Sequence, residues 1–150
     1  IGTNHVRIEG DTGIFTSKLI DGRFPDYQRV IPKSGDKITE VDKDTLKAAL
    51  SRTAILCNEK FRGVRFELRN DLLRILANNP DQEAAEDELQ INYNRGDLDI
   101  GFNVNYLLDI LHVFGPGAVR LTFIDSNSSM LVEEAGNESN SLFVVMPMRL

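Results

Sequence analysis

Residues 42–57 read DKDTLKAALSRTAILC, and this stretch decides the fold that the sequence predicts. Asp42 can cap a helix, because its side chain can accept the free backbone N–H groups of the first turn. The side chains that follow at spacings of four, three and four residues would share one helix face. These residues are Leu46, Leu50, Thr53 and Cys57. We therefore predict a helix over residues 43–57 that buries this face.

A second stretch of the same kind lies further along the chain. Residues 103–114 read NVNYLLDILHVF, with Asn103 as the helix cap and Gly115-Pro116 as the stop. Leu107, Ile110, Leu111 and Phe114 would form its buried face. Each predicted helix has one strand-like segment before it and three after it. These segments cover residues 37–41, 64–69, 72–77 and 84–93 in the first unit and 97–102, 118–124, 128–134 and 141–148 in the second.

The order β-α-β-β-β thus occurs twice, with an offset of about 60 residues and no repeat of the residues themselves. Two such halves can bury both helices against one face of their sheets. The sequence therefore predicts an α+β domain with two helices on one face of antiparallel sheets. Ahead of it, residues 4–9 and 13–19 flank Gly10-Asp11 and predict a leading hairpin. Residues 21–36, dense in turn-forming residues, predict a linker.

Composition limits the class of protein. The 150 residues are 41% hydrophobic and carry a formal net charge of −6, so nucleic-acid binding would have to rest on local placement of basic residues. The longest apolar stretch, residues 142–148, is far shorter than the roughly 20 residues of a membrane helix, and we expect no membrane partner. The single cysteine, Cys57, fits a reducing cytoplasm. Because a strand-like segment follows Ile1 almost at once, we expect a piece of a longer chain.

Residues that could carry chemistry are few. Asp109 and His112 have the helical spacing i, i+3, so they could hold a metal or orient a base, but a solvated helix face is the favoured interpretation. Cys57 lies on the predicted buried face, which favours a core residue over a reactive thiol. Carboxylates gather at residues 83–88 without the loop spacing of a calcium site, and a solvated strand is favoured there.

Two apolar features favour binding surfaces. Ile55 would point away from the buried helix face and Leu56 sideways, so they either cover a neighbouring loop or meet another chain. The chain end, residues 144–150, is almost wholly apolar although termini are usually polar. Pro147 cannot donate to a strand ladder, and the two methionines beside it offer a surface that can adapt to different partners. We predict a groove for an apolar peptide there, with a strand buried in its own core as the alternative.

Basic residues are concentrated in and just after the first predicted helix. They are Lys43, Lys47, Arg52, Lys60 and Arg62. Neighbouring long cations favour phosphate contacts that do not depend on sequence, although composition alone favours a simple solvated helix. The second predicted helix has no lysine or arginine, so any DNA-facing surface would be weak and diffuse.

Five segments together resemble one known family. In order, LIDGRFPDYQRVIP (19–32), AILCNEKFRGVR (54–65), ANNPDQEAAE (77–86), IGFNVNYLLDIL (100–111) and VVMPMRL (144–150) closely resemble the DNA polymerase III beta subunit, the bacterial sliding clamp. The resemblance covers essentially the whole chain. It implies that residues 1–28 are the tail of the family's middle domain and linker, and that residues 29–150 are its third, C-terminal domain.

The resemblance also implies a function and a set of site residues. It implies a DNA replication processivity factor without catalysis or cofactor, which holds polymerase subunits, the clamp loader and repair proteins through a peptide-binding pocket. Asn127 stands where the family often has an aliphatic residue, so the pocket rim is expected to be more polar. The matching pocket positions are Pro25, Arg29, Val30, Phe61, Asn103, Tyr106, Asn127, Ser129, Val144, Val145, Met146, Pro147, Met148 and Arg149.

The family assembles as a head-to-tail dimeric ring that encircles DNA. By resemblance, Ile55 and Leu56 lie at the seam between subunits, and Lys47, Arg52 and Arg62 face the DNA. Such a heterologous contact closes a ring only when the family's first domain is present. Two alternatives remain: a small metal-dependent hydrolase built on Asp109, His112 and the acidic strand, and an unrelated protein-interaction domain of the same fold.

Overall fold

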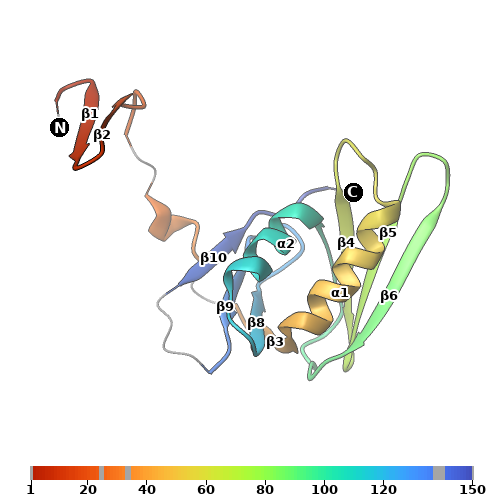
Figure 1. The fold of residues 1–150 in the computed structure, drawn as a ribbon. Coiled ribbons are helices and arrows are strands. Elements are labelled where there is room, and N and C mark those ends of the chain that lie inside the picture. Colours follow the sequence, from red (N-terminus) through yellow and green to blue (C-terminus); the bar gives the residue numbers. More distant parts are fainter. Residues whose placement is uncertain (1, 24–25, 33–34, 137–140, 150) are drawn as a thin grey trace.

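The computed structural model describes residues 2–23, 26–32, 35–136 and 141–149, and Figure 1 shows its arrangement. Two short 3-10 turns, η1 and η2, accompany two α-helices and ten strands in the described residues. The elements are β1 (His5–Gly10), β2 (Gly13–Lys18), η1 (Tyr27–Arg29), β3 (Lys37–Asp42), α1 (Lys43–Thr53), η2 (Ala54–Leu56), β4 (Gly63–Arg69), β5 (Leu72–Asn78), β6 (Ala84–Gln90), β7 (Leu98–Asn103), α2 (Val104–Val113), β8 (Ala118–Phe123), β9 (Met130–Glu134) and β10 (Leu142–Val145).

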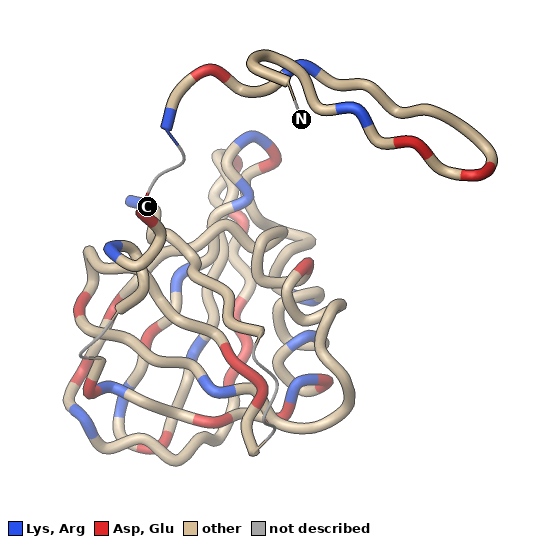
Figure 2. Tube along the Cα trace, turned by 90° about the vertical axis from the view of Figure 1, so that its left-hand side faces the viewer, with Lys and Arg blue, Asp and Glu red and all other residues tan. Residues whose placement is uncertain are grey.

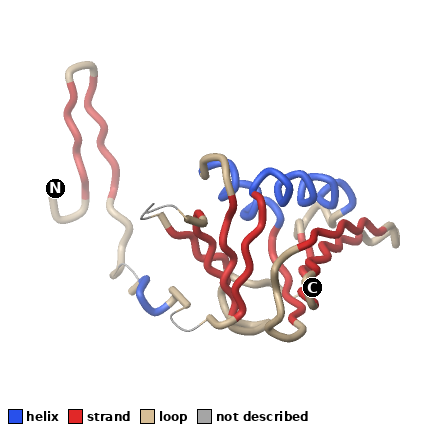
Figure 3. Tube along the Cα trace, turned by 90° about the horizontal axis from the view of Figure 1, so that it is seen from below, coloured by secondary structure: helices blue, strands red, loops and turns tan. Residues whose placement is uncertain are grey.

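The strands of the body form two antiparallel sheets. The first sheet has the order β6-β5-β4-β7 and the second sheet the order β10-β9-β8-β3. Each sheet therefore takes three strands from one β-α-β-β-β unit and the leading strand of the other. Viewed from below, the two helices lie together on one side of both sheets (Figure 3). The predicted fold class is confirmed, whereas the exchange of leading strands was not foreseen.

The first helix is shorter than predicted. The α-helix ends at Thr53, and the chain continues as the 3-10 turn η2 up to Leu56. The N–H group of Cys57 donates to the carbonyl of Ala54 at 3.4 Å, which is the i to i+3 bond that tightens a helix end. The predicted buried face survives this change, because Leu46, Leu50, Thr53 and Cys57 are all buried. The predicted cap is also present: Asp42 accepts from the N–H group of Thr45 at 2.8 Å.

Two strands end earlier than predicted. β6 stops at Gln90 because the next backbone N–H groups bind Asp71, which lies in the turn before β5. The N–H group of Ile91 donates to the Asp71 carbonyl, and that of Tyr93 donates to the Asp71 side chain. β10 stops at Val145, two residues before Pro147, which has no N–H group to donate. Local side-chain and proline chemistry therefore ends strands that the apolar pattern would have continued.

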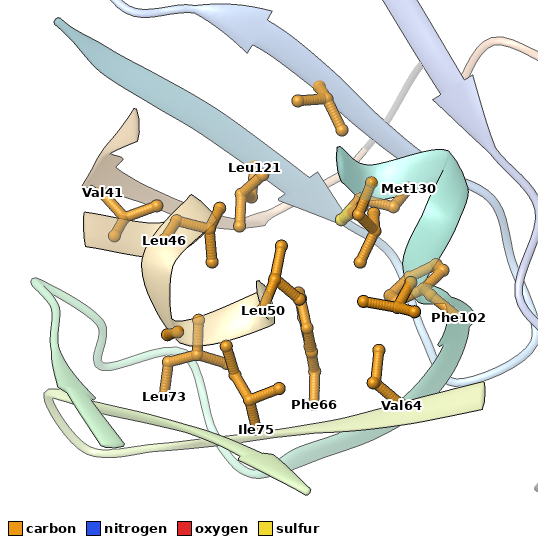
Figure 4. Close-up of a cluster of buried hydrophobic side chains, with 14 of the residues drawn as sticks. Val41, Leu46, Leu50, Val64, Phe66, Leu73, Ile75, Phe102, Leu121 and Met130 are labelled. Carbon is orange, nitrogen blue, oxygen red and sulfur yellow. The ribbon is translucent and has the colours of Figure 1, made fainter. Parts of the chain in front are cut away.

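Both helices and both sheets share one hydrophobic core. Leu50 of α1 lies between residues of the two sheets, including Phe66 of the first and Leu121 of the second (Figure 4). Phe66 packs edge-on against Phe102, with ring centroids 5.5 Å apart. α1 packs on β5 and β6, and α2 on β7 and β10, so the helices seal the space between the sheets. The core therefore holds the two units together as one body.

The leading hairpin is a separate feature. β1 and β2 form the predicted hairpin, and they pair from His5 with Lys18 to Gly10 with Gly13. The hairpin stands apart from the two-sheet body (Figure 1), and Ile8, Ile14 and Phe15 are each about 60% exposed. Among the described residues, neither helix is long and apolar enough to cross a membrane.

Because Leu50 is fully buried between the sheets, its truncation should leave a cavity that the core cannot close. We predict that Leu50→Ala lowers the free energy of unfolding by about 2–5 kcal/mol. Chemical denaturation monitored by circular dichroism would measure this loss. The exposed neighbour provides the control: Ser51→Ala should change the same quantity by less than about 0.5 kcal/mol.

Candidate protein-binding site

The C-terminal segment leaves the second sheet and crosses to the first. Val145 is buried at the end of β10, whereas the next side chain, Met146, is 64% exposed. Beyond Pro147, the N–H group of Met148 donates to the carbonyl of Gly101 at 2.9 Å, forming an isolated bridge to β7. The segment is therefore held at both ends, and Met146 projects between the two attachments.

One groove opens between α2 and β10. It has a volume of 410 Å³ and places Tyr106 and Val113 of the helix opposite Val144 and Met146 of the chain end. Tyr106 is 61% exposed and Val113 is 68% exposed, so apolar surface faces the groove instead of the core. We call it the helix groove. An apolar side chain that entered it would be removed from water at little cost in reorganisation.

A second groove, the linker groove, also has Met146 in its lining. Its volume is 610 Å³, and its walls are η1 with the residues after it, residues 28–32, and the loop from Ile124 to Ser129. Asp26 stabilises the first wall, since its side chain accepts from the N–H group of Gln28 at 3.2 Å and lies 3.3 Å from Arg29 Nε. Met146 lines both grooves and is their common element.

The loop that forms the second wall is braced by one carboxylate. Asp125 Oδ1 accepts from the N–H groups of Asn127 and Ser128, each at 2.8 Å. The bond from Asn127 is the main reason that the pKa of Asp125 lies below its usual value of 3.8. The Ser129 hydroxyl then donates to Met146 Sδ at 3.0 Å, which ties the loop to the chain end.

Phe61 and Asn103 form a separate contact near the start of α2. Asn103 caps this helix by accepting from the N–H group of Asn105 at 2.9 Å, and its Nδ2 donates to the Phe61 carbonyl at 3.3 Å. The Phe61 ring is 55% exposed and lies 5.3 Å from Lys60 Nζ. Neither residue lines the two grooves.

The structure thus distributes the residues of the predicted pocket over two grooves and the surface outside them. Arg29, Val30, Asn127, Ser129 and Met146 line the linker groove, and Tyr106, Val144, Val145 and Met146 line the helix groove. Phe61, Asn103, Pro147, Met148 and Arg149 lie outside both grooves, and Pro25 lies outside the described residues.

Sequence reasoning missed several groove residues. Asp109, Ile110, Val113 and Phe143 also line the helix groove, and Gln28, Ile31, Pro32, Ile124 and Ser128 the linker groove. Tyr106, Ile110 and Val113 have the i, i+4, i+7 spacing of one helix stripe, so a second apolar face on this helix was the available signal. The linker groove had no such signal, because its walls are about 95 residues apart in the chain.

The residues expected at the subunit seam lie beside an open strand edge. Ile55 is 78% exposed on η2, and Leu56 is half-buried. η2 packs next to β6, and within the described residues β6 pairs with a neighbour on one side only. An apolar side chain beside a free strand edge is a combination that suits contact with another chain.

The residues expected to face DNA are largely engaged by the protein itself. Arg52 Nε lies 2.6 Å from Asp87 Oδ2 on β6, and Arg62 donates through Nε to Asn105 Oδ1 and through Nη1 to the Ala54 carbonyl, each at 3.4 Å. Lys47 is half-buried. Figure 2 shows basic and acidic residues interspersed along the body. The helix surface therefore offers only a mild positive charge.

The groups considered for catalysis have structural contacts. His112 Nδ1 lies 2.7 Å from the Leu108 carbonyl of its own helix, and Cys57 is buried with its Sγ donating to Ala54 at 3.1 Å. Over the described ranges, no three histidine, cysteine or acidic side chains gather as metal ligands would. These contacts favour the solvated helix face and the core cysteine over chemical roles.

Comparison with known proteins gives one consistent answer. Residues 28–149 match the family model of the DNA polymerase III beta subunit, C-terminal domain. The chain is 57% identical over its whole length to the beta sliding clamp of Pseudomonas aeruginosa and 51% identical to that of Escherichia coli K12. It spans 41% of the length of each of these relatives. A crystal structure of the P. aeruginosa DNA polymerase III beta subunit superimposes with a TM-score of 0.90, covering all of this chain and 41% of that one.

A ligand complex of the same relative is also similar. The P. aeruginosa sliding clamp bound to griselimycin matches with a TM-score of 0.87, over 100% of this chain and 40% of that one. Fold and sequence therefore define a clamp-type α+β protein. The chain belongs to the DNA polymerase III beta subunit family, through its C-terminal domain.

The bracing of the linker-groove loop by the Asp125 carboxylate predicts a dependence on pH. Because the folded pKa of Asp125 is lowered, its stabilising effect is complete above pH 3.8 and is lost as the pH falls through the lower folded value. We predict that hydrogen-exchange protection of the Asn127 and Ser128 amides is constant down to about pH 4 and falls below it. Asp125→Ala should lower this protection severalfold at neutral pH, whereas the exposed control Asp81→Ala should not.

Proposed function

We propose that the chain is the C-terminal part of a bacterial replication processivity clamp, which acts without catalysing a reaction itself. The observation that carries the proposal is the meeting of two open grooves at Met146, in a chain of the beta subunit family. We place the whole protein in the cytoplasm. Residues 1–28 would be the end of a middle domain and its linker, and residues 29–150 a third domain. The separate position of the hairpin supports this division (Figure 1).

The grooves would receive short apolar motifs from polymerase subunits, the clamp loader and repair proteins. Met146 can contact a peptide in either groove, and its flexible thioether adapts to different side chains. Two or three buried anchors typically give about micromolar affinity, roughly −8 kcal/mol. The griselimycin complex of a relative supports the view that this type of clamp can bind a compact ligand.

DNA would lie along the helix side without sequence-specific contacts. Lys47, Arg52 and Arg62 would contribute a weak positive charge, and the pairing of Arg52 with Asp87 keeps that charge low. Strong phosphate contacts would slow movement along DNA, so weak contacts suit a sliding ring. Retention would then come from closure of the ring. Ile55 and Leu56, beside the free edge of β6, would meet the first domain of the next subunit.

We predict that Met146→Ala combined with Met148→Ala weakens binding of a polymerase-tail peptide to the full-length protein by at least about tenfold. The reason is the loss of the Met146 side chain, which is exposed and lines both grooves. Fluorescence anisotropy with a labelled peptide would measure the change. Ile38→Ala, an exposed apolar residue on β3, serves as the control; unchanged affinity in the double variant would exclude the assigned pocket.

Ring closure predicts a dependence on DNA topology. The full-length protein, loaded by its clamp loader, should remain on nicked circular DNA during gel filtration and leave when a restriction enzyme linearises the circle. Ile55→Asp with Leu56→Asp should open the seam by burying charge there, so that light scattering reports a monomer and retention is lost. Ile38→Asp is the matched control. Equal retention on linear and circular DNA would argue against a clamp.

A further inference from the structure

The outer face of the first sheet has three arginines with very different surroundings. Arg74 on β5 is surrounded by carboxylates: Glu67 Oε2 lies 3.1 Å from its Nη1, Glu88 Oε1 lies 3.1 Å from its Nε, and Glu86 is a third partner. Arg69 on β4 is likewise paired, with Asp99 Oδ1 2.6 Å from its Nη1. The charges of both arginines are therefore balanced within the sheet.

Arg65 differs from the other two. It points to the same outer face as Glu67 and Arg69, because these positions alternate along β4, and it is exposed. Within the described parts of the chain, the guanidinium group of Arg65 has no hydrogen bond or ion pair. Its neighbours across the sheet in register are Leu76 on β5 and Gly101 on β7, which have no charge. An unpaired guanidinium group keeps its five donors available for an anion.

A groove surrounds this arginine. It has a volume of 400 Å³, and its lining includes Arg65, Leu76, Asn78 and Ala84 from three adjacent strands. Gly63 and Ala84, which also line it, have little or no side chain. Glu86 also borders the groove, but its carboxylate is held by Arg74. The groove therefore combines a free cation with an apolar floor.

The groove lies two strands away from the chain end that borders the candidate protein-binding site. Arg65 pairs in register with Gly101, and Gly101 forms the bridge to Met148. Two strand spacings separate Met148 from Arg65, which is about 10 Å. Gly63, which lines the groove, pairs with Asn103 in the same way. A partner segment that runs beside Met148 can span this distance to Arg65 with about three extended residues.

We propose that this Arg65 groove binds an acidic residue, next to an apolar one, in the partner segment that flanks the docked motif. The inference rests on the proposed function, since the motif brings the segment to the sheet. The guanidinium group of Arg65 would hold the carboxylate with two parallel hydrogen bonds, and Leu76 would cover the apolar neighbour. The groove would thus select partners by the charge beside their motif.

The test uses the full-length protein and polymerase-tail peptides extended, at one end or the other, by Asp-Leu-Asp or by the uncharged Asn-Leu-Asn. Fluorescence anisotropy at low and moderate salt would give each affinity. We expect the acidic extension at one end to bind about twofold to fivefold more tightly than its uncharged match, as an exposed ion pair allows. Arg65→Gln should abolish this difference, and Arg95→Gln, an exposed loop arginine, should preserve it.

A charge exchange provides the second arm. Arg65→Glu should prefer a Lys-Leu-Lys extension over Asp-Leu-Asp, and thermal unfolding would establish that each variant is folded. If the acidic and uncharged peptides bind equally well to the wild-type protein, or if Arg65→Gln keeps the preference, the inference is wrong while the pocket stands. If no polymerase-tail peptide binds at all, the proposed function fails and the inference falls with it.

Discussion

The body of the protein depends on two strand pairings that cross between its halves, β3 with β8 and β7 with β4. Each β-α-β-β-β unit alone would present one apolar sheet face and one apolar helix stripe to water. Exchanging the leading strands joins the units through backbone hydrogen bonds, and the core around Leu50 and Phe66 fills the space between the sheets (Figure 4). Because each sheet needs a strand from the other half, neither half is complete without its partner.

The same exchange produces the candidate site. β7 lies at the edge of the first sheet, where the carbonyl of Gly101 can accept a hydrogen bond from the N–H group of Met148. β10 lies at the edge of the second sheet. The chain end must therefore cross from one sheet to the other, and Pro147 prevents it from continuing as a strand. Met146 becomes exposed at that crossing, between the helix groove and the linker groove. The segments on both sides of it are anchored, by the pairing of Val145 with Met130 and by the bond from Met148 to Gly101.

Charge is arranged so that strong interactions stay within the protein. Arg52, Arg69 and Arg74 are all paired with carboxylates of the first sheet, although the chain carries a net charge of −6. Surface pairs of this kind add little to stability, but they remove free cations from the surface. What remains is a weakly charged helix side and a single unpaired arginine, Arg65, among the three on the outer face of the first sheet.

The sequence by itself determined the elements and the faces they bury. The spacing of Leu46, Leu50, Thr53 and Cys57, the Asp42 cap and the repeated order of one helix and four strands predicted an α+β body with both helices on one side, because periodicity and capping are local properties of the chain. Its apolar end likewise predicted a surface for a partner. Only the tertiary structure decided which strands exchange, that residues 28–32 and 124–129 form one groove, and that Arg52 and Arg62 are already engaged. Those outcomes depend on contacts between residues far apart in the chain, whose register no local pattern specifies.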